Sequence, residues 1–498
     1  MVKQTRQPAL SAAQPSRESV QHILERLGTR VGTLVNDSRK AMPGSVFVAY
    51  PGEARDGRDY IAQAVAQRVD GVLWEADHYQ WDSALAVPNA GVSGLRERSG
   101  EIAAHVYGEP ARALHMVGVT GTNGKTSVAH WIAQAFSQLG RKTAVVGTVG
   151  NGFPDALTPA LNTTPDAIEL QQRLAQYRQQ GATACAMEVS SHGLVQGRLN
   201  GTCFNVAVLT NLSRDHLDYH GDMDAYAAAK ARMFAWPGLE SAVLNTDDAF
   251  GKRLESECSS ARVAGYGFGR GAVVADKLRL SQAGLHLRVH SDWGDADLDA
   301  PLLGRFNAAN LLAVLTTLLV SGVGLEDACR ALAHITPPPG RMQTLGGNAH
   351  PLVVVDYAHT PDALDKVLAT LREIVGGGRL VCVFGCGGNR DRGKRPLMGQ
   401  SVARGADEIW VTSDNPRNED PRQIIDDILA GMADANPIHP VHVEPDRARA
   451  IFEAIGNARQ GDVVLIAGKG HEDYQEIAGD RLPFSDLAVA KKALEAWA

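Results

Sequence analysis

The best-marked structural unit of this chain contains the segment Thr120-Gly121-Thr122-Asn123-Gly124-Lys125-Thr126-Ser127. It follows the short apolar run 115–120 and precedes apolar residues at helical spacing, which are Val128, Trp131, Ile132, Ala135, Phe136 and Leu139. A glycine-rich turn between a strand and a helix presents backbone N–H groups and a positive helix end to polyphosphate. The segment therefore predicts a phosphate-binding loop, in which Lys125 holds the terminal phosphates and Thr126 meets Mg²⁺.

The match to the general phosphate-loop pattern is partial. That pattern has a glycine where this chain has Val119. A chance Gly-Lys-Thr on a turn is the alternative interpretation. The flanking strand and helix favour phosphate binding over it.

Strand-like and helix-like segments alternate along most of the chain, which predicts an α/β fold. Boundaries are predicted at the stretch 108–113 and at Pro337-Pro338-Pro339-Gly340, which cannot continue a helix. Three domains result: a smaller N-terminal α/β domain at 1–110, a central phosphate-loop domain with a mostly parallel sheet at 111–340, and a C-terminal Rossmann-like α/β domain at 341–498. Residues 1–16 are expected to form a loose tail.

Several predicted strands end on polar residues. The apolar runs ending at Met187, Leu209 and Val355 lead into Glu188, Thr210-Asn211 and Asp356. Because ligands bind at the carboxyl ends of strands in open α/β sheets, we expect these polar residues to converge on one site. Residues 277–280 and 285–289 alternate around Gly284, which predicts a small inserted hairpin.

Composition narrows the class of protein. A net charge of -7 in 498 residues lacks the basic excess that nucleic-acid binding needs. The six cysteines are scattered, without paired spacing, and predict reduced thiols. The first residues lack an apolar signal core, and the stretch 311–325 is too short and interrupted to cross a bilayer, so it predicts a buried helix. We expect a cytoplasmic enzyme without membrane insertion.

A second polar cluster consists of residues 188–193 (EVSSHG) and 211–218 (NLSRDHLD). Acidic and histidine side chains beside a phosphate loop can coordinate Mg²⁺ and neutralise charge on phosphate. Two alternatives are a hydrolase using Ser191 and His192, which lack a G-x-S-x-G elbow, and a transition-metal site at Asp215, His216, Asp218 and His220. Lys230, on an alanine-rich helix, has no role that its sequence context indicates.

The third cluster is C-terminal: residues 385–390 (GCGGNR), 413–417 (SDNPR) and 468–472 (GKGHE). Each follows a predicted strand, so two arginines and one glutamate should meet beside the sheet. Arginine binds carboxylates bidentately and Glu472 suits an ammonium group. An amino acid carries both groups. Surface ion pairs at loop ends are the alternative.

Together these motifs resemble the Mur ligase family over nearly the whole chain. The resemblance is carried by residues 121–126 (GTNGKT), 188–193 (EVSSHG), 211–220 (NLSRDHLDYH), 356–361 (DYAHTP), 414–417 (DNPR) and 468–475 (GKGHEDYQ). Folylpolyglutamate synthases share the scaffold, but the cell-wall motifs argue against that branch.

The resemblance implies the residues of each site. Lys125, Glu188, His216 and Lys230 would be catalytic, with Thr126, Glu188, His216 and a carbamylated Lys230 holding Mg²⁺. ATP would meet Thr120 to Thr126, Asn307, Asn310, Arg341, Asp356 and His359. The UDP-muramoyl peptide would meet Asn36, Ser38, Glu53, Ala54, Arg55, Asn162, Thr163, Thr164, Ser190, Gln196 and Arg198. Diaminopimelate would meet Arg390, Asp414, Asn415, Pro416, Arg417, Gly468 and Glu472. Residues 53–55 depart from the His-Gln-Ala common in the family.

The resemblance also implies a reaction. An ATP-dependent ligase would add meso-diaminopimelate to UDP-N-acetylmuramoyl-L-alanyl-D-glutamate through an acyl phosphate, in the synthesis of peptidoglycan precursors. ATP is then a co-substrate, Mg²⁺ the cofactor, and all partners small molecules; we expect a monomer. The lysine-adding form of the ligase and a phosphate-loop kinase or NTPase are the alternatives, and a nucleotide-gated binding protein without net synthesis is a third.

Overall fold

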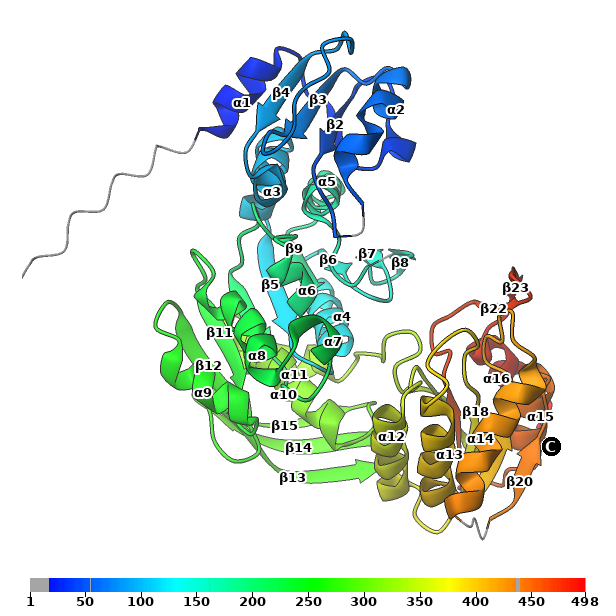
Figure 1. The fold of residues 1–498 in the computed structure, drawn as a ribbon. Helices are drawn as coiled ribbons and strands as arrows, with labels where there is room; N and C mark the ends of the chain where they lie inside the picture. Colours follow the sequence, from blue (N-terminus) through cyan, green and yellow to red (C-terminus); the bar gives the residue numbers. More distant parts are fainter. Residues whose placement is uncertain (1–17, 54, 161, 436–438, 498) are drawn as a thin grey trace, which may run out of the picture. The chain divides into compact units, whose positions relative to one another are not determined.

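The computed structural model describes residues 18–53, 55–160, 162–435 and 439–497. The chain divides into two compact units (Figure 1). The first comprises the described part of Met1–Ala111 together with Asp166–Gln176 and Gln196–Thr202, and the second holds Arg112–Pro165, Tyr177–Val195 and the rest from Cys203. The expected tail at 1–16 and Ala54 lie outside the described residues.

The first unit is built on a four-stranded parallel sheet. Its order is β1-β2-β3-β4, with bounds β1 (Thr33–Val35), β2 (Ser45–Ala49), β3 (Gly71–Glu75) and β4 (Asn89–Val92). Its helices are α1 (Val20–Leu27), η1 (Ser38–Lys40), η2 (Gly57–Tyr60), α2 (Ile61–Ala66), α3 (Leu95–Val106) and the first part of α5 (Ala167–Gln179). Successive residues of β2 enter different cores, Val46 and Val48 one and Phe47 and Ala49 the other, as period-two alternation requires.

The second unit contains an eleven-stranded sheet in the order β15-β14-β13-β12-β11-β10-β5-β9-β6-β7-β8, parallel from β13 to β6. The strands are β5 (His115–Thr120), β6 (Thr143–Val146), β7 (Asn151–Phe153), β8 (Ala156–Thr158), β9 (Ala184–Glu188), β10 (Val206–Leu209), β11 (Ser241–Asn245), β12 (Arg262–Gly267), β13 (Val273–Ser281), β14 (Gly284–Ser291) and β15 (Gly294–Ala300).

Three helices bury one face of this sheet: α4 (Lys125–Gln138), α10 (Arg305–Val320) and α11 (Leu325–Leu332). The remaining short helices are η3 (Pro110–Ala113), α6 (Ser191–Val195), α7 (Leu217–His220), α8 (Met223–Ala231), η4 (Arg232–Ala235) and α9 (Ala249–Glu257). The predicted antiparallel hairpin around Gly284 is confirmed as β13 and β14, and it belongs to the large sheet, because β13 pairs with β12 and β15 adds a third antiparallel strand. The expectation of one buried helix at 311–325 needs correction: residues 311–319 are buried in α10, whereas α10 ends at Val320 and a partly exposed turn leads to Leu325, the first residue of α11.

The C-terminal part of the second unit has a six-stranded sheet in the order β16-β17-β21-β18-β19-β20, in which only β16 is antiparallel. Its strands are β16 (Gln343–Gly346), β17 (Leu352–Asp356), β18 (Leu380–Phe384), β19 (Glu408–Val411), β20 (Val441–Val443) and β21 (Val463–Ala467), and β22 (Tyr474–Ile477) and β23 (Asp480–Pro483) form a separate hairpin.

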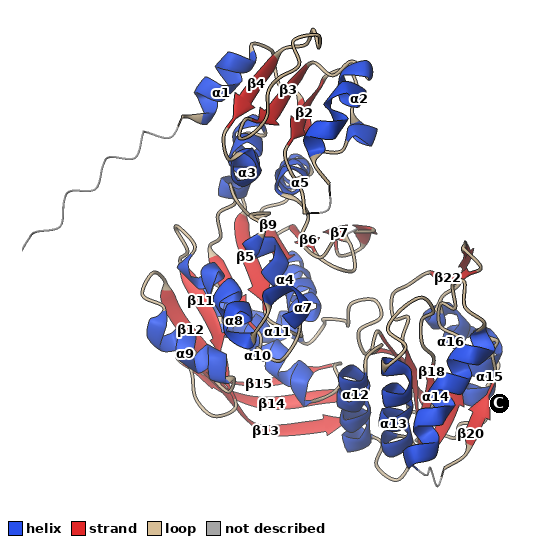
Figure 2. Ribbon diagram, in the orientation of Figure 1, coloured by secondary structure: helices blue, strands red, loops and turns tan. Residues whose placement is uncertain are grey.

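Helices cover both faces of this sheet (Figure 2). On one face, α12 (Pro361–Ile374), α13 (Lys394–Gly405) and α14 (Pro421–Ala435) pack against the sheet. On the other face, α15 (Arg447–Gly456) and α16 (Asp486–Glu495) pack against it. The predicted α/β class with a small N-terminal, a central and a C-terminal sheet is confirmed. The domain bounds at 110 and 340 stay predictions. No helix in the described ranges is long and apolar enough to span a membrane.

A close backbone approach in the first unit gives a stability test. A Cβ on Gly100, inside α3, would lie 1.8 Å from the carbonyl oxygen of Asn200. Gly100→Ala should therefore lower the free energy of unfolding of this unit by about 1 to 3 kcal/mol, measured by chemical denaturation.

The matched control is Gly456→Ala at the end of α15, where an added Cβ meets nothing within 4 Å. This substitution should leave stability unchanged or raise it by less than about 1 kcal/mol. Equal stability of the two variants would contradict the packing described for α3.

Candidate active site

The predicted phosphate loop links β5 to α4. Gly124 caps α4 with a left-handed φ of 86°, and a Cβ there would lie 2.5 Å from Asn310 Oδ1. Glycine is therefore required both for the backbone conformation and for the approach of α10. Asn310 lies on α10, and its Nδ2 donates to Oδ1 of Asn307 on the same helix at 3.3 Å. Two of the predicted ATP residues are thus held beside the loop.

Lys125 folds back over this loop. Its Nζ donates to the carbonyl oxygens of Gly121 and Thr122, each at 2.9 Å. Burial lowers the pKa of Lys125, while the negative charge of Glu188 opposes that shift. Charge interactions are stronger at such a position than in water, so a protonated Lys125 can act strongly on a bound phosphate.

Glu188 ends β9 and is buried. Thr126 Oγ1 donates to its Oε2 at 3.1 Å, and the backbone N–H of Thr148 donates to its Oε1 at 2.7 Å. Mg²⁺ takes oxygen ligands, so this adjacent hydroxyl and carboxylate fit such an ion. Thr148 is a contact that the sequence motifs did not indicate.

Lys230 lies on α8 and is 1% exposed. Its Nζ donates to Gly121 O at 2.8 Å and lies 4.6 Å from the ring centroid of Tyr226. Burial holds the pKa of Lys230 well below its ordinary value, and the neighbouring charge of Lys125 lowers it further. The structure therefore brings Lys230 to the phosphate loop, which its sequence context did not indicate.

His216 has a left-handed φ of 52° and a side chain that is 45% exposed. Its ring packs edge-on against the ring of His192, with centroids 4.9 Å apart. In the described part of the chain, no group of three or more His, Cys, Asp and Glu side chains is arranged to hold a metal ion. The transition-metal alternative therefore gains no support. The hydrolase alternative would use Ser191 with His192. In the structure Ser191 is buried, and its Oγ lies 2.9 Å from Nε2 of a different histidine, His220.

Three predicted muramoyl-peptide residues surround Glu188. Thr164 Oγ1 donates to Glu188 O at 2.9 Å and accepts from Ser190 N at 3.1 Å. Thr163 Oγ1 lies 2.9 Å from Thr148 Oγ1. Asn162 is exposed. Thr163, Thr164 and Ser190 therefore belong to the hydrogen-bond network that Glu188 shares with Thr126 of the phosphate loop.

The other predicted muramoyl-peptide residues belong to the first unit. Gln196 links Glu53 and Arg198: its Nε2 donates to Glu53 Oε1 at 2.7 Å and its Oε1 accepts from Arg198 Nε at 2.7 Å. The others bond within the unit: Asn36 to Tyr50 at 3.2 Å, Ser38 to Gln63 at 3.1 Å and Arg55 to Tyr60 at 3.4 Å.

Asp356 ends β17 in the six-stranded sheet, whereas Glu188 ends β9 and Thr210 follows β10 in the eleven-stranded sheet. The charge of Arg341 acts on the pKa of both Asp356 and Lys125. The convergence of these strand ends on one site stays a prediction. The carboxylate of Asp356 accepts from the backbone N–H groups of Met342 and Ala358, each at 2.8 Å.

The neighbours of Asp356 include two more predicted ATP residues. Arg341 Cζ lies 5.0 Å from the ring centroid of Tyr357, and His359 Nδ1 lies 2.7 Å from Tyr357 O. Burial raises the pKa of Asp356, and the charge of Arg341 opposes this shift. Arg341 therefore lies near the end of β17.

The three predicted loops after β18, β19 and β21 do meet. Gly388 N donates to Asn415 O at 2.9 Å, and Asn415 Nδ2 donates to Glu472 Oε2 at 2.8 Å. Arg417 Nη1 donates to Gly388 O at 2.8 Å.

The other predicted diaminopimelate residues differ in exposure. Asp414 and Pro416 are buried beside Asn415. Gly468 has a φ of 118°, and a Cβ added to it would lie 2.6 Å from Asp414 Oδ2. Arg390 is exposed at the rim.

Two charged residues at these loops were missed by the motif reading. Lys469 is fully buried, and its Nζ donates to Asn415 Oδ1 and Glu472 Oε2, each at 3.0 Å. Glu476 pairs with Arg417 at 3.3 Å. Lys469 lies within the motif 468–472 and Glu476 directly after the motif 468–475, but only the fold shows which neighbours they contact.

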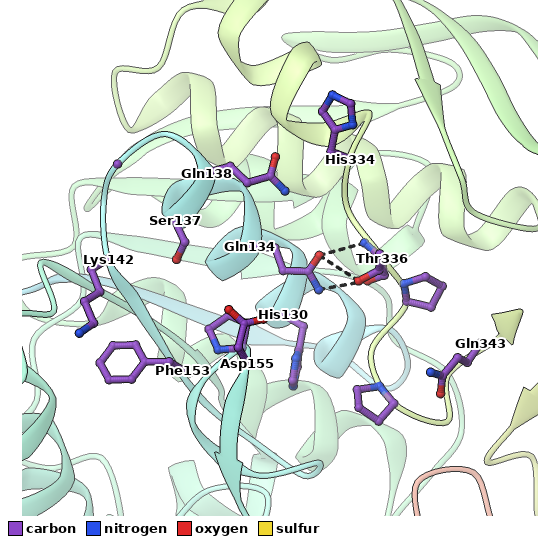
Figure 3. Close-up of a pocket in the computed structure, with 14 residues that line it drawn as sticks. His130, Gln134, Ser137, Gln138, Lys142, Phe153, Asp155, His334, Thr336 and Gln343 are labelled. Atoms are coloured by element: carbon purple, nitrogen blue, oxygen red, sulfur yellow. Dashed lines mark hydrogen bonds between the residues drawn. The ribbon is translucent and has the colours of Figure 1, made fainter. Parts of the chain in front are cut away.

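A cavity of about 670 Å³ lies elsewhere, between the second half of α4, the β7-β8 turn and the stretch 334–343 (Figure 3). None of the predicted site residues lines it. Gln134 and Thr336 are joined by three hydrogen bonds, at 2.9, 3.1 and 3.5 Å. Burial lowers the pKa of His130, in its wall, to about 4. The bonds fasten the chain before the C-terminal sheet to α4.

Comparison with known proteins identifies the family. Residues 119–318 match the Mur ligase middle domain and residues 340–470 match the "Mur ligase, glutamate ligase domain". A UDP-N-acetylmuramoyl-L-alanyl-D-glutamate–2,6-diaminopimelate ligase from Chromobacterium violaceum is 55% identical over 479 residues, which are 95% of this chain and 96% of that protein. A ligase of the same name from Nitrosomonas europaea is 48% identical, over 97% of this chain and 98% of that protein.

A solved structure of a protein with this name has a TM-score of 0.71 and 40% sequence identity, and the match covers 94% of this chain and 95% of that one. The predicted family and the ligase class are thereby confirmed. This chain belongs to the Mur ligase family.

Proposed function

We propose that this chain is the ligase that joins meso-diaminopimelate to UDP-N-acetylmuramoyl-L-alanyl-D-glutamate, with ATP as co-substrate, in peptidoglycan precursor synthesis. The observation that carries the proposal is the meeting of the three C-terminal loops, where Arg417 and Glu472 lie on loops that hydrogen bonds join to one another. The names of the relatives above support the same substrates.

The reaction activates a carboxylate. The side-chain carboxylate of D-Glu attacks the γ-phosphorus of ATP and ADP leaves, giving an acyl phosphate. The amine of diaminopimelate attacks the acyl carbon, phosphate leaves with the C–O bond pair, and the amine proton passes to solvent. Because phosphoryl transfer needs little covalent help, positioning and charge should supply most of the rate.

The residues that hold ATP are proposed from their positions. The loop Thr120 to Thr126 presents its backbone and Lys125 to the phosphates. Asn307 and Asn310 on α10, with Arg341, Asp356 and His359 at the start of the C-terminal sheet, complete the nucleotide site. Thr126, Glu188, His216 and a carbamate on Lys230 would hold Mg²⁺. The ion would neutralise charge on the phosphate oxygens.

The muramoyl peptide is assigned to two groups of residues. Thr163, Thr164 and Ser190 lie near Glu188, which suits the D-Glu end, and Asn162 is proposed to act with them. Asn36, Ser38, Glu53, Ala54, Arg55, Gln196 and Arg198 are proposed for the uridine end. We place the reaction in the cytoplasm, where free thiols such as the buried Cys185 and Cys382 stay reduced, and propose a monomer.

We propose that the enzyme selects its amino-acid substrate by the carboxylate and ammonium groups at the end that does not react. Arg417 would pair with the far carboxylate and Glu472 with the far ammonium, with Arg390, Asp414, Asn415, Pro416 and Gly468 around them. Lysine has no far carboxylate, so it would leave the guanidinium without that partner. A site built to pair such a group can reject an analogue by about 10⁴-fold.

The first test is a phosphate-release assay with purified substrates. Release should require the muramoyl dipeptide and meso-diaminopimelate together, and lysine should be a poor replacement. Arg417→Lys, which keeps the charge but loses the fork, should raise KM for diaminopimelate far more than KM for ATP.

Arg372→Lys serves as the matched control, because Arg372 is an exposed arginine that pairs with Asp407 at 2.7 Å away from the loops. It should leave both KM values unchanged. Comparable efficiency with lysine would point to the lysine-adding form, and ATP turnover without either substrate would point to a simple NTPase.

Lys230 is proposed to carry a carbamate. The neutral amine attacks CO₂, and one proton leaves as the N–C bond forms, so a lowered amine pKa favours the reaction near neutral pH. The change also replaces repulsion between Lys230 and Lys125 with attraction between opposite charges. The lysine would then serve as an anionic ligand.

In ¹³C-bicarbonate buffer, the enzyme should show a carbamate carbonyl resonance by ¹³C NMR that disappears in Lys230→Arg. Lys142→Arg, which changes a lysine that donates to Gln180 O at 2.7 Å, should keep the resonance. A resonance that survives in Lys230→Arg would assign the modification to another lysine, and its absence from the parent enzyme would remove the proposal.

A further inference from the structure

A buried arginine lies under the C-terminal loops. The side chains of Arg447 and Asp486 are both 0% exposed and form a bidentate ion pair. Arg447 Nε donates to Asp486 Oδ1 at 2.7 Å, and Nη2 donates to Oδ2 at 2.8 Å. These two residues are the first residues of α15 and α16. The pair therefore joins the N-terminal ends of the two helices that cover one face of the sheet.

The remaining donors of this guanidinium reach the backbone. Arg447 Nη2 donates to Ala467 O at 3.0 Å and Nη1 donates to Ser413 O at 3.3 Å. Ala467 is the last residue of β21, and Ser413 follows β19 by two residues. The next residues, Asp414 and Gly468, begin the loops assigned to diaminopimelate. One side chain thus fixes the first peptide of both loops.

Electrostatics favours the charged form of this arginine. Burial by itself would lower the pKa of Arg447, but Asp486, helped by the more distant Asp414 and Glu472, holds the pKa above its usual value. The cation therefore lies beneath two acidic residues of the loops. Its charge and its geometry both depend on Asp486, because a buried cation without a partner is costly.

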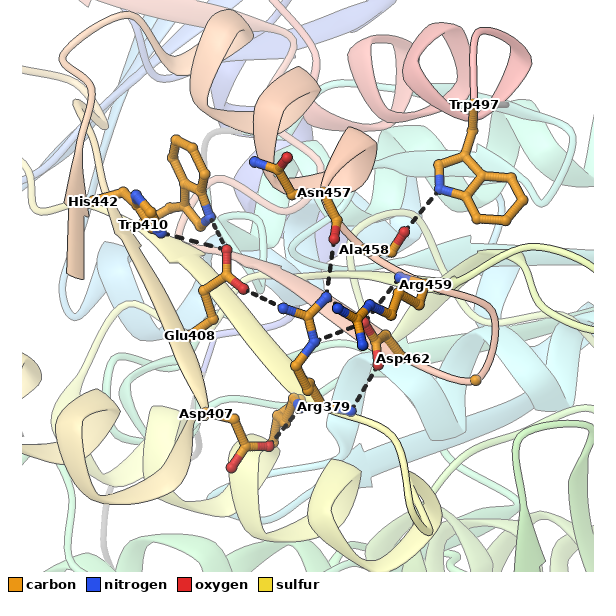
Figure 4. Close-up of polar contacts among 12 residues, drawn as sticks. Arg379, Asp407, Glu408, Trp410, His442, Asn457, Ala458, Arg459, Asp462 and Trp497 are labelled. Atoms are coloured by element: carbon orange, nitrogen blue, oxygen red, sulfur yellow. Dashed lines mark hydrogen bonds and ion pairs between the residues drawn. The ribbon is translucent and has the colours of Figure 1, made fainter. Parts of the chain in front are cut away.

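A second arginine network lies at the opposite end of the same strands (Figure 4). Arg379 pairs with Asp462 and Glu408, each at 2.7 Å. These three residues stand immediately before or at the start of β18, β21 and β19. This network ties the amino ends of the strands, away from the carboxyl-end loops, so it offers a structural comparison within one sheet.

We infer that Arg447, oriented by Asp486, is a positioning residue that sets the relative placement of the 413–417 and 468–472 loops and thereby the affinity for the incoming amino acid. The inference rests on the proposed function for its substrate. Arg447 touches no proposed substrate atom; it acts through the carbonyls of Ser413 and Ala467. Small displacements of such loops cost large factors in binding and rate.

The test replaces the whole pair. Removing one partner would leave an unpaired buried charge, whereas Arg447→Met combined with Asp486→Leu removes both charges at similar volume. This double variant should raise KM for diaminopimelate by about tenfold or more while KM for ATP stays within about twofold. Arg447→Lys, which keeps the charge opposite Asp486 but not the fork, should shift KM in the same direction if the double variant does not fold.

The control is Arg379→Met, which should lower the thermal midpoint without raising KM for diaminopimelate. A folded double variant with unchanged KM for diaminopimelate, or a control with the same rise, would overturn the inference. Hydrogen exchange of residues 413–417 and 468–472 without substrate is measured in parallel. If the parent enzyme does not use diaminopimelate at all, the proposed function is rejected. Faster exchange in the double variant would then still support the positioning role of Arg447. Unchanged exchange would reject both the positioning role and the proposed function.

Discussion

The site depends on the pairing of three neighbouring parallel strands. Because β5 lies between β9 and β10, the loops after all three emerge at the same edge of the sheet. The neighbours then bond to the phosphate loop: Thr122 N donates to Asn211 O at 2.8 Å, and Thr210 Oγ1 donates to Asn123 O at 2.6 Å. The shape of the loop is therefore a property of the sheet as much as of its glycines.

Buried basic side chains recur around the proposed sites, and their donors are satisfied in two ways. Lys125 and Lys230 share the carbonyl oxygen of Gly121 and have lowered pKa values. Arg447, in contrast, is matched by a full carboxylate charge. Carbonyl acceptors satisfy donors without cancelling charge, so the charge of a protonated Lys125 stays available to anions, whereas Asp486 cancels the charge of Arg447. The first suits chemistry on phosphate and the second suits a rigid support.

Sequence patterns predicted the local elements that rest on periodicity and glycine. The apolar run 115–120 before the phosphate loop agrees with β5, and the helical spacing after the loop agrees with α4. Patterns did not predict that β13 to β15 join the large sheet, because pairing between strands far apart in sequence depends on tertiary packing. They also gave Lys230 no role, since an alanine-rich helix does not reveal which face lies against Gly121.

Long-range partners were missed for the same reason. The motifs gave roles to Glu472 and Arg417 but none to the residues already paired with them, Lys469 and Glu476. These pairs bear on how a ligand enters the proposed amino-acid pocket. A head group with one ammonium and one carboxylate can exchange partners with both pairs and leave the net charge unchanged. A bare ammonium can only compete with Lys469 for Glu472, which adds an uncompensated positive charge to a partly desolvated site. In the proposed pocket, selectivity for a zwitterionic end would therefore follow from pre-existing ion pairs as well as from bidentate pairing with Arg417.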